Sequence, residues 1–266
     1  MNPSMIDSFR KNRWFTGLFV IAGLLLVLFV LLPVLSTIAD SHWVSLWQAV
    51  IDPEVQSALG VSFVAALWAT LLVALSGIPL AYLLARTNFR GKSWVTGLIN
   101  LPIVIPHTAA GIALLLVFGR QSFMGKFLGS LGLSFVDDLP GIVIGMAFVS
   151  LPFLVSTARE AFELVDPELE RIALTEGASA WQAFYHVTLP LAWRGLVAGA
   201  LMMWGRGISE FGAVVILAYH PKTIPVLVYE RFYGFGLAAA QPVSVLLILA
   251  SLLVFLLVQV LVRLKE

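Results

Sequence analysis

The sequence predicts an all-α integral membrane protein with six transmembrane helices. Of its 266 residues, 60% are hydrophobic and only 12% are charged. The mean hydropathy is +0.97, and a water-soluble fold of this composition would lack the polar residues needed to cover its surface. Six apolar stretches also reach the length of roughly 20 residues that a helix needs to cross a hydrocarbon core about 30 Å thick.

The predicted transmembrane helices follow one another with mostly short connections. They cover residues 15–39, 58–85, 94–119, 139–158, 189–218 and 237–262. Since most connections are too short to fold by themselves, we expect residues 1–266 to form a single membrane domain. Small residues four apart, Gly141 with Gly145 and Gly195 with Gly199, predict places where two helix backbones approach closely.

Prolines lie within several of the predicted helices and each permits a kink, among them Pro33, Pro79, Pro102, Pro106 and Pro152. The third includes LPIVIPHTAAG, residues 101–111, in which two prolines each free a backbone carbonyl, so we expect a break or a bend there. His107 follows directly, and we expect it to bond to a freed carbonyl; a ligand or a proton relay is the alternative. The fifth helix carries Arg206 and Glu210 about halfway along, beside glycines that weaken helical structure.

Lysine and arginine outside the predicted helices are unequally divided between the two sides of the membrane. Ten fall on one side: Arg10, Lys11, Arg13, Arg86, Arg90, Lys92, Arg159, Arg171, Arg263 and Lys265. Four fall on the other: Arg120, Lys126, Lys222 and Arg231. Because cytoplasmic loops carry the excess of these residues, we place both termini and the connection of residues 159–188 in the cytoplasm.

The connection of residues 159–188 is predicted to begin with an amphipathic helix. Apolar residues recur there at spacings of three and four, which puts them on one helical face: Phe162, Val165, Leu169, Ile172 and Ala173. Acidic residues fall mostly elsewhere. Helices that lie on a membrane surface favour Lys and Arg on their polar face, so a protein partner explains an acidic helix better than the alternative of an interfacial anchor.

Local signals predict where the helices of this connection begin and end. Asp166 followed by Pro167 resembles an N-cap with proline in the first turn. Gly177 is suited to the left-handed conformation that ends helices. Ser179 and Gln182 have the spacing of a capping box for a second short helix. The connection is therefore predicted to be a helix, a glycine joint and a second helix that leads into the fifth transmembrane helix.

The segment GASAWQAFYHVTLP, residues 177–190, resembles the cytoplasmic loop of binding-protein-dependent ABC importer permeases. The pattern in that family is Glu-Ala-Ala, three residues, Gly, nine residues, Ile, one residue and Leu-Pro. This chain departs from it with Arg171, Ile172 and Ala173 at the Glu-Ala-Ala positions, although Glu170 lies adjacent. The resemblance implies a coupling helix that docks on an ATP-binding subunit. The coupling residues that it implies are Glu170, Arg171, Ala173, Gly177, Ala178 and Ser179.

The resemblance covers nearly the whole chain and is strongest to the molybdate/tungstate permeases of that family. The segments that carry it are GIPLAYLLAR, LPIVIPHTAAGIALLLVFG, RGISEFGAVVILAY and LVYERF. It implies a homodimer in a prokaryotic cytoplasmic membrane, two ATP-binding subunits on the cytoplasmic side, and an extracytoplasmic binding protein that delivers the oxyanion. A sulfate/thiosulfate permease is the alternative, because those permeases are near relatives with the same layout.

Arg206 and Glu210 are the charged residues that we most expect to be functional. A charge at the centre of a transmembrane helix costs about 2.5–3.5 kcal/mol on insertion scales, and a pair four residues apart lies on one helical face and reduces that cost. An internal ion pair is one explanation. The resemblance implies that this segment lines the translocation path, which makes Arg206, Ser209 and Glu210 candidate path or gate residues. Permeation requires that an anion is bound weakly enough to leave.

Several other function classes are disfavoured. The chain has no cysteine, which excludes disulfides and thiolate metal sites. Its four histidines have no metal-ligand spacing, and no convergent set of catalytic groups is present in the predicted helices. We therefore expect no metal, no nucleic-acid partner and no catalytic site. A secondary anion transporter is a further alternative, but it would be expected to show repeats with paired interrupted helices, which the sequence does not display.

The triplet Gly91, Lys92 and Ser93 imitates the end of a phosphate-binding loop. That motif needs a second glycine five positions earlier, where this chain has Arg86. No predicted strand precedes the triplet either. We therefore expect no nucleotide cofactor in this subunit and assign ATP hydrolysis to a separate partner.

Overall fold

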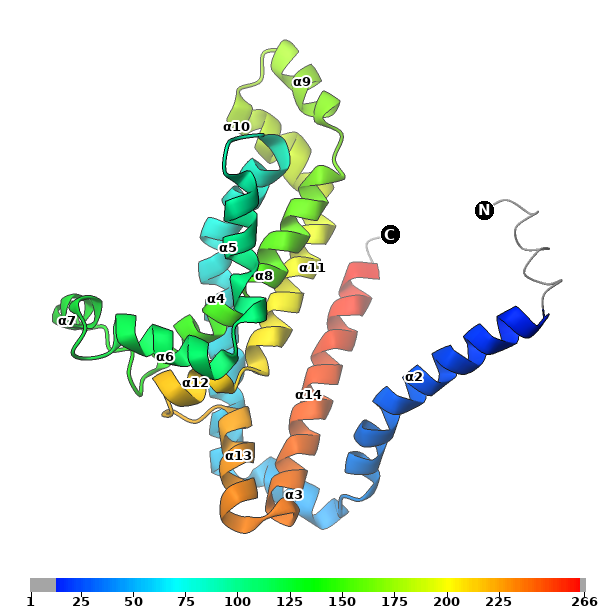
Figure 1. Ribbon diagram of the computed structural model, residues 1–266, viewed down its shortest axis with the longest axis vertical. Helices are drawn as coiled ribbons and strands as arrows, with labels where there is room; N and C mark the ends of the chain where they lie inside the picture. The colour runs from blue at the N-terminus through cyan, green and yellow to red at the C-terminus, as the bar shows by residue number, and fades with distance from the viewer. Residues whose placement is uncertain (1–12, 264–266) are drawn as a thin grey trace.

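The computed structural model describes residues 13–263, and every element in that range is a helix (Figure 1). In chain order they are α2 (Arg13–Ala39), α3 (Trp43–Ile51), α4 (Pro53–Arg86), α5 (Lys92–Val104), α6 (His107–Phe118), α7 (Phe123–Ser130), α8 (Leu139–Glu163), α9 (Pro167–Thr175), α10 (Ala180–Ala183), the π-helix η1 (Phe184–Thr188), α11 (Leu189–Ile208), α12 (Gly212–Leu217), α13 (Ile224–Phe235) and α14 (Leu237–Arg263). The all-α prediction is confirmed. Arg10, Lys11 and Lys265, which contribute to the charge count, lie outside the described residues.

Fewer helices in residues 13–263 are long enough to cross a membrane than the six that the sequence predicts. Within the described residues, four helical stretches are long and apolar enough to cross a membrane: α2, α4, α8 and the continuous stretch from α10 to α11. The pair α5 and α6 makes a fifth if the two are counted as one span, although they meet at a bend of 113°. The protein is therefore a multi-pass membrane protein, while the sixth crossing, which α14 would supply, stays a prediction.

Helices α4, α8 and α11 form the centre of the bundle. Alanines of α4 (Ala65, Ala66, Ala69) face large side chains of α8 such as Ile142 and Met146, and all five are buried. The small side chains let the two helix axes approach closely, and the large ones fill the space between them. This packed centre fixes the positions of the helix ends that carry the polar residues.

The close helix contacts predicted from small residues are confirmed. A methyl group added at Gly195 of α11 would overlap the side chain of Ala161 on α8, and one at Gly199 would lie 3.1 Å from Thr157 Cβ. The bundle therefore depends on these glycines because a larger residue would push α8 and α11 apart.

Replacing Gly195 with valine is expected to lower the free energy of unfolding by about 1–3 kcal/mol, because overpacking a tight contact forces backbone shifts. Gly205→Ala is the matched control on the same helix, since no atom lies within 4 Å of the added methyl group. Thermal unfolding in detergent measures both variants. Equal stability of the two would contradict the predicted dependence on close packing.

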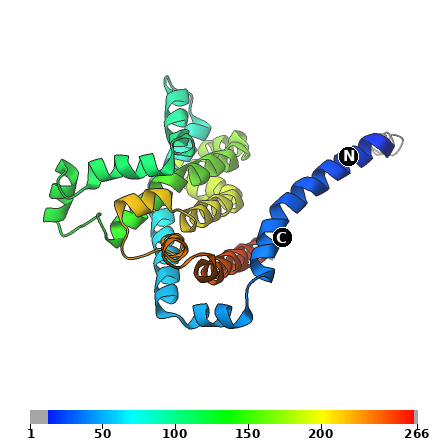
Figure 2. The same ribbon diagram turned by 60° about the horizontal axis from the view of Figure 1, so that its bottom comes forward.

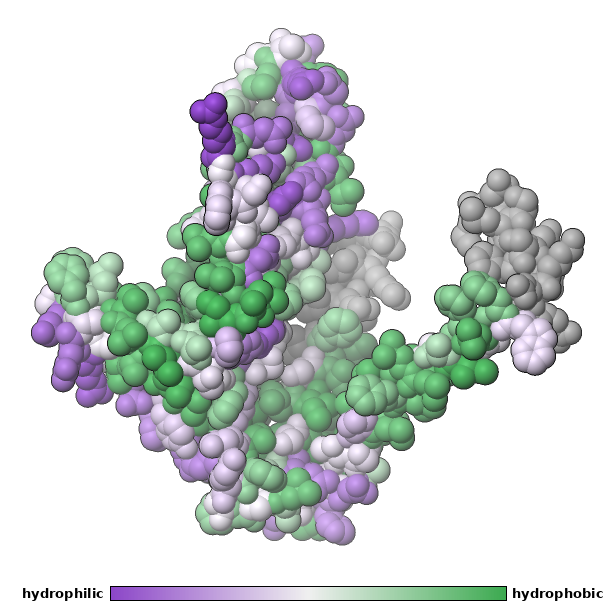
Figure 3. All heavy atoms as spheres, viewed as in Figure 1, coloured by the Kyte–Doolittle hydropathy of each residue, from purple (hydrophilic) through white to green (hydrophobic). Residues whose placement is uncertain are grey.

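Helix α2 lies apart from the bundle. It leans away from the other helices in both ribbon views (Figures 1 and 2), and its central apolar side chains are exposed, for example Leu25 at 63% and Phe29 at 75%. One hydrogen bond ties its end to α14, from Gln241 Nε2 to the Thr37 carbonyl at 3.1 Å. Figure 3 shows hydrophobic residues along α2 and hydrophilic residues gathered at the end of the molecule that carries α9 and α10. This distribution fits a helix that faces lipid.

Several predicted helix boundaries were wrong. The predicted fifth helix, residues 189–218, stops at Ile208 and restarts at Gly212. The fourth, predicted to end at residue 158, continues to Glu163, so the following connection begins at residue 164 instead of 159. In the fourth helix, the hydropathy pattern missed the end because Arg159 and Glu163 continue the helix as an i, i+4 ion pair at 2.7 Å. In the fifth, it missed the internal break, while α12 ends at Leu217, close to the predicted end.

Candidate functional site

Two broken helices meet near the middle of the bundle. The first breaks between α5 and α6, where Pro106 has an extended backbone. The second breaks between α11 and α12, at residues 209–211. Helices α6 and α12 lie side by side, and Gly212 permits this because a Cβ there would lie only 2.8 Å from His107 Cβ. Irregular backbone at membrane depth is tolerated where protein buries it or where it lines a cavity.

Four polar side chains converge where the breaks meet, and we call them the polar cluster: His107, Arg206, Ser209 and Glu210. Arg206 Nη2 lies 2.9 Å from Glu210 Oε2 and 3.0 Å from His107 Nδ1. The same His107 nitrogen lies 3.0 Å from Glu210 Oε2. Arg206 Nη1 is 3.3 Å from Ser209 Oγ. The cluster therefore joins the start of α6 to the end of α11.

Glu210 is the buried member of the cluster, with its side chain 1% exposed. Its second oxygen, Oε1, accepts the backbone N–H of Ala213 at 2.9 Å, in the first turn of α12. A buried carboxylate is tolerated only when a cation and hydrogen bonds compensate it, and Arg206, His107 and the α12 backbone supply these. Glu210 therefore stabilises the junction between α11 and α12.

Arg206 and His107 form the accessible face of the cluster. Their side chains are 24% and 36% exposed, respectively, and Ser209 beside them is exposed. Arg206 also lies in the last turn of α11, where the helix dipole favours a cation. Because Glu210 lies 2.9 Å from Arg206 and balances its charge, the accessible face carries little net positive charge.

The pairing of Arg206 with Glu210 was predicted correctly from their spacing, but the expected role of His107 was wrong. Its ring contacts Arg206 and Glu210 instead of a carbonyl freed by the neighbouring prolines. The bend between α5 and α6 turns the start of α6 toward α11, which brings together residues 99 positions apart. The two prolines pointed to a break in the chain, but no pattern in the sequence indicated what the break would face.

The connection between α8 and α11, residues 164–188, forms a second polar centre that we call the elbow. Glu170 of α9 accepts three side-chain hydrogen bonds: from Tyr82 Oη at 2.9 Å, from Arg86 Nε at 2.8 Å and from Thr188 Oγ1 at 2.7 Å. Arg86 Nη2 also donates to the Val165 carbonyl at 3.0 Å. These bonds fasten α9 to the end of α4 and to the start of α11.

Glu170 therefore faces the interior of the protein. The side chains of Glu170 and Arg86 are only 13% and 12% exposed. Burial favours a higher pKa for the Glu170 carboxyl, but the bonds from Thr188, Arg86 and Tyr82 outweigh burial and lower its pKa below the ordinary value. The carboxylate is thus an internal anchor of the elbow and stays ionised at neutral pH.

The other predicted coupling residues lie at or near the elbow surface. Arg171 is exposed and pairs with Glu168. The Ala178 N–H donates to the Ala173 carbonyl at 3.0 Å across the joint, and both alanines are half-buried. Gly177 at the joint has a left-handed φ of 93°, which confirms its predicted conformation.

Both predicted helix starts in the elbow are confirmed. The side chain of Asp166 accepts the Glu168 N–H at 3.0 Å at the start of α9. Ser179 and Gln182 form the expected reciprocal capping box at the start of α10. These caps fix the path of the chain on both sides of the joint, so α9 and α10 have defined directions.

The helix expected at the start of the connection is α9, but the five apolar residues assigned to one of its faces do not all belong to that helix. Phe162 ends in the core at the end of α8, whereas Leu169 and Ile172 are exposed on α9, because Asp166 and Pro167 begin a new helix with a new direction. The large apolar residues exposed on the elbow are Leu164, Leu169, Ile172, Leu174, Trp181 and Tyr185. An apolar group of this size beside charged residues is typical of a protein interaction surface.

A third group of charges lies at the opposite end of the molecule. Arg231 contacts Asp52 at 2.6 Å and Glu54 at 3.2 Å, and Lys222 contacts Glu54 at 2.9 Å and Glu230 at 2.8 Å. The bond from Arg231 lowers the pKa of Asp52, and the bond to Glu230 raises that of Lys222. These ion pairs tie α3 and α4 to α13, and Glu230 and Arg231 belong to this network. No group of three His, Asp or Glu side chains within residues 13–263 is arranged to hold a metal.

Comparison with known families decides what kind of protein this is. Residues 77–266, which include the polar cluster and the elbow, match the family described as binding-protein-dependent transport system inner membrane component. The chain belongs to this family. Members are inner membrane components of transport systems, so the chain is a transport-system subunit.

Individual relatives agree with this assignment. The chain is 41% identical over 240 residues to a molybdate/tungstate transport system permease protein of Pyrococcus abyssi, covering 90% of this chain and 92% of the relative. It is 37% identical to the protein of the same description from Methanocaldococcus jannaschii, covering 91% and 94%. The sulfate transport system permease protein of Escherichia coli is 32% identical, covering 87% and 86%.

Solved structures share the fold. The crystal structure of a bacterial alginate ABC transporter, in complex with an alginate pentasaccharide-bound periplasmic protein, contains a chain with a TM-score of 0.74 at 14% identity, covering 95% of this chain and 94% of that one. A chain of the inward-facing MetNI methionine ABC transporter gives a TM-score of 0.62 at 20% identity, covering 80% and 94%. The fold of this family member is therefore an ABC permease fold.

Proposed function

We propose that this protein is the permease subunit of an ATP-driven, binding-protein-dependent importer that carries molybdate or tungstate across a prokaryotic cytoplasmic membrane. The observation that carries the proposal is the identity of 37–43% to several curated molybdate/tungstate permeases over 81–91% of the chain. Two copies of the chain would form the path, two ATP-binding subunits would supply energy, and an extracytoplasmic protein would deliver the anion.

The elbow suits the docking of the ATP-binding subunit. Its exposed apolar residues offer a contact surface, and Glu170 fastens that surface to α4 and α11. The excess of lysine and arginine on the elbow side supports a cytoplasmic position for the elbow. Helices α2 and α14 both run toward that side from the end that carries α3 and α13 (Figure 1), so both termini are cytoplasmic in this proposal.

The polar cluster suits the passage of an oxyanion. Molybdate and tungstate are dianions, and an arginine on the path lowers the electrostatic cost of bringing one into the membrane. The ion pair of Arg206 with Glu210 at 2.9 Å weakens the attraction of Arg206 for the anion, which lets the ion leave again. Since α11 and α12 are separate helices at this point, a movement of α11 changes the position of Arg206 and opens or closes the path.

The test is the ATPase activity of the assembled complex. The chain is co-purified with its ATP-binding subunits, reconstituted in nanodiscs and mixed with binding protein loaded with molybdate, tungstate or sulfate. We expect molybdate or tungstate to stimulate ATP hydrolysis. Greater stimulation by sulfate would identify a sulfate permease, which the relatives at 32% identity support less strongly. Uptake by the chain alone, driven by an ion gradient, would contradict an ATP-driven mechanism.

A further inference from the structure

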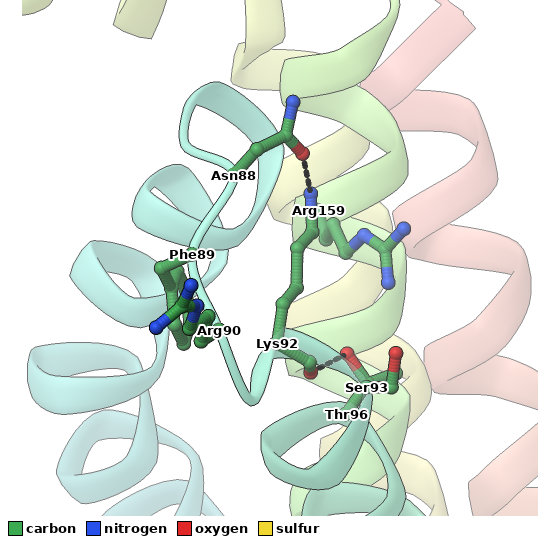
Figure 4. Close-up of a pocket in the computed structure, with 7 residues that line it drawn as sticks. All are labelled: Asn88, Phe89, Arg90, Lys92, Ser93, Thr96 and Arg159. Atoms are coloured by element: carbon green, nitrogen blue, oxygen red, sulfur yellow. Dashed lines mark hydrogen bonds between the residues drawn. The ribbon is translucent and has the colours of Figure 1, made fainter.

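A basic pocket lies on the side of the molecule that carries the elbow and has no part in the proposed transport path. It has a volume of about 720 Å³ and is formed by the loop between α4 and α5, the first turns of α5 and the end of α8 (Figure 4). Its lining residues are Asn88, Phe89, Arg90, Lys92, Ser93, Thr96 and Arg159. Three of the seven are cations and none is a carboxylate.

The cations of the pocket are incompletely balanced. Lys92 Nζ contacts only neutral oxygens, the Thr87 carbonyl at 3.2 Å and Asn88 Oδ1 at 3.4 Å, and Figure 4 shows it reaching back toward Asn88. Arg90 is exposed. Arg159 pairs with Glu163 at 2.7 Å, so one of the three positive charges is compensated by a neighbouring acid. The pocket therefore retains a local excess of positive charge.

The backbone at the pocket adds to its attraction for anions. Gly91 has a left-handed φ of 94° and directly precedes α5. The first N–H groups of a helix lack partners within the helix and carry a partial positive charge. The Gly-Lys-Ser triplet that imitated a nucleotide motif thus presents a lysine, a hydroxyl and a helix start to one pocket, although the glycine-rich loop of a nucleotide site is absent.

The surroundings of the pocket identify the source of the anion. Trp94, Leu98 and Leu101 lie on one face of α5 with exposures of 85%, 70% and 44%. Tryptophan collects at the level of lipid headgroups and leucine faces the acyl chains, so the pocket lies at headgroup level. Basic pockets between transmembrane helices on the cytoplasmic side bind the headgroups of anionic lipids.

We propose that this pocket binds the phosphate of an anionic phospholipid from the leaflet on the elbow side of the membrane. The lipid phosphate accepts hydrogen bonds from Arg90, Lys92 and the start of α5, and the acyl chains lie along the apolar face of α5. Because the pocket joins α5 to α8, a bound lipid holds together the two helices that lead to the polar cluster and to the elbow.

Native mass spectrometry of the full chain in mild detergent tests this site, with phosphatidylglycerol and phosphatidylcholine as the two probes. We expect the wild type to retain phosphatidylglycerol selectively. Arg90→Gln/Lys92→Gln is expected to lower that retention about 25-fold, since each lysine or arginine near a membrane surface contributes about fivefold. The charge-matched control, Arg120→Gln/Lys126→Gln on the opposite side, should retain the lipid. Arg90→Lys/Lys92→Arg, which keeps both charges, should retain it as well.

Three outcomes overturn the proposal. One is equal retention of phosphatidylglycerol by the wild type and by Arg90→Gln/Lys92→Gln, and another is equal binding of the two lipids by the wild type. The third is displacement of phosphatidylglycerol by 1 mM inorganic phosphate or molybdate, which would assign the pocket to a free oxyanion. If the double variant fails to fold, Arg90→Gln alone provides the same comparison because its side chain is exposed. None of these readouts depends on transport activity.

Discussion

Replacing Arg206 with alanine is expected to lower oxyanion uptake by about tenfold or more. The variant removes the guanidinium group from the polar cluster. Raising the free-energy barrier for the ion by only about 1.4 kcal/mol slows its passage tenfold. The variant also leaves Glu210, 1% exposed, with His107 and one backbone N–H as its remaining partners. We therefore expect a loss of about 2–3 kcal/mol in unfolding free energy, below the usual cost of breaking a fully buried pair because Arg206 is 24% exposed.

A second variant separates the loss of transport from the loss of stability. Arg206→Ala/Glu210→Gln removes both charges, while the amide oxygen of glutamine keeps an acceptor for the Ala213 N–H. We expect this double variant to recover most of the stability and none of the uptake, as measured by thermal unfolding and by uptake into proteoliposomes containing the whole complex. Affinity for the loaded binding protein should stay unchanged. Normal uptake by the double variant would show that the pair is structural only.

The parts of the structure that the sequence predicted well are those set by local chemistry. Caps at Asp166 and Ser179, the glycine joint at Gly177 and the break near Pro106 all depend on residues within about one helical turn. The i, i+4 contact of Arg206 with Glu210 is local in the same sense. Such features follow from backbone preferences, which hold whatever the rest of the fold does.

The parts that the sequence did not predict depend on contacts between distant segments. His107 joins Arg206 across 99 positions, and Glu170 joins Arg86 across 84. The end of the fifth helix at Ile208 was missed because the apolar stretch continues to residue 218, although the glycines beside Arg206 weaken helical structure. The close approach of α6 and α12 at Gly212 is a further contact that a single sequence does not reveal.

Replacing Glu170 with alanine is expected to uncouple ATP hydrolysis from transport. The variant removes the acceptor of three hydrogen bonds and leaves the buried Arg86 without its carboxylate, which costs about 2–4 kcal/mol in unfolding free energy. The elbow would keep its exposed docking residues but lose its attachment to α4 and α11. Basal ATP hydrolysis should therefore persist, while the stimulation by loaded binding protein should fall severalfold.

Glu168→Ala is the matched control for this prediction, because Glu168 lies on the same helix, is 60% exposed and pairs only with Arg171 among the described residues. An exposed pair of this kind contributes little, so its removal should change stability by no more than about 0.5 kcal/mol and leave the stimulation intact. Glu170→Gln keeps an acceptor for Tyr82 and Thr188. Its stimulation of ATP hydrolysis should therefore lie between those of Glu168→Ala and Glu170→Ala. Loaded binding protein could instead stimulate ATP hydrolysis equally in Glu168→Ala and Glu170→Ala. In that case the bonds of Glu170 are not required for coupling, and the exposed surface of the elbow alone accounts for it.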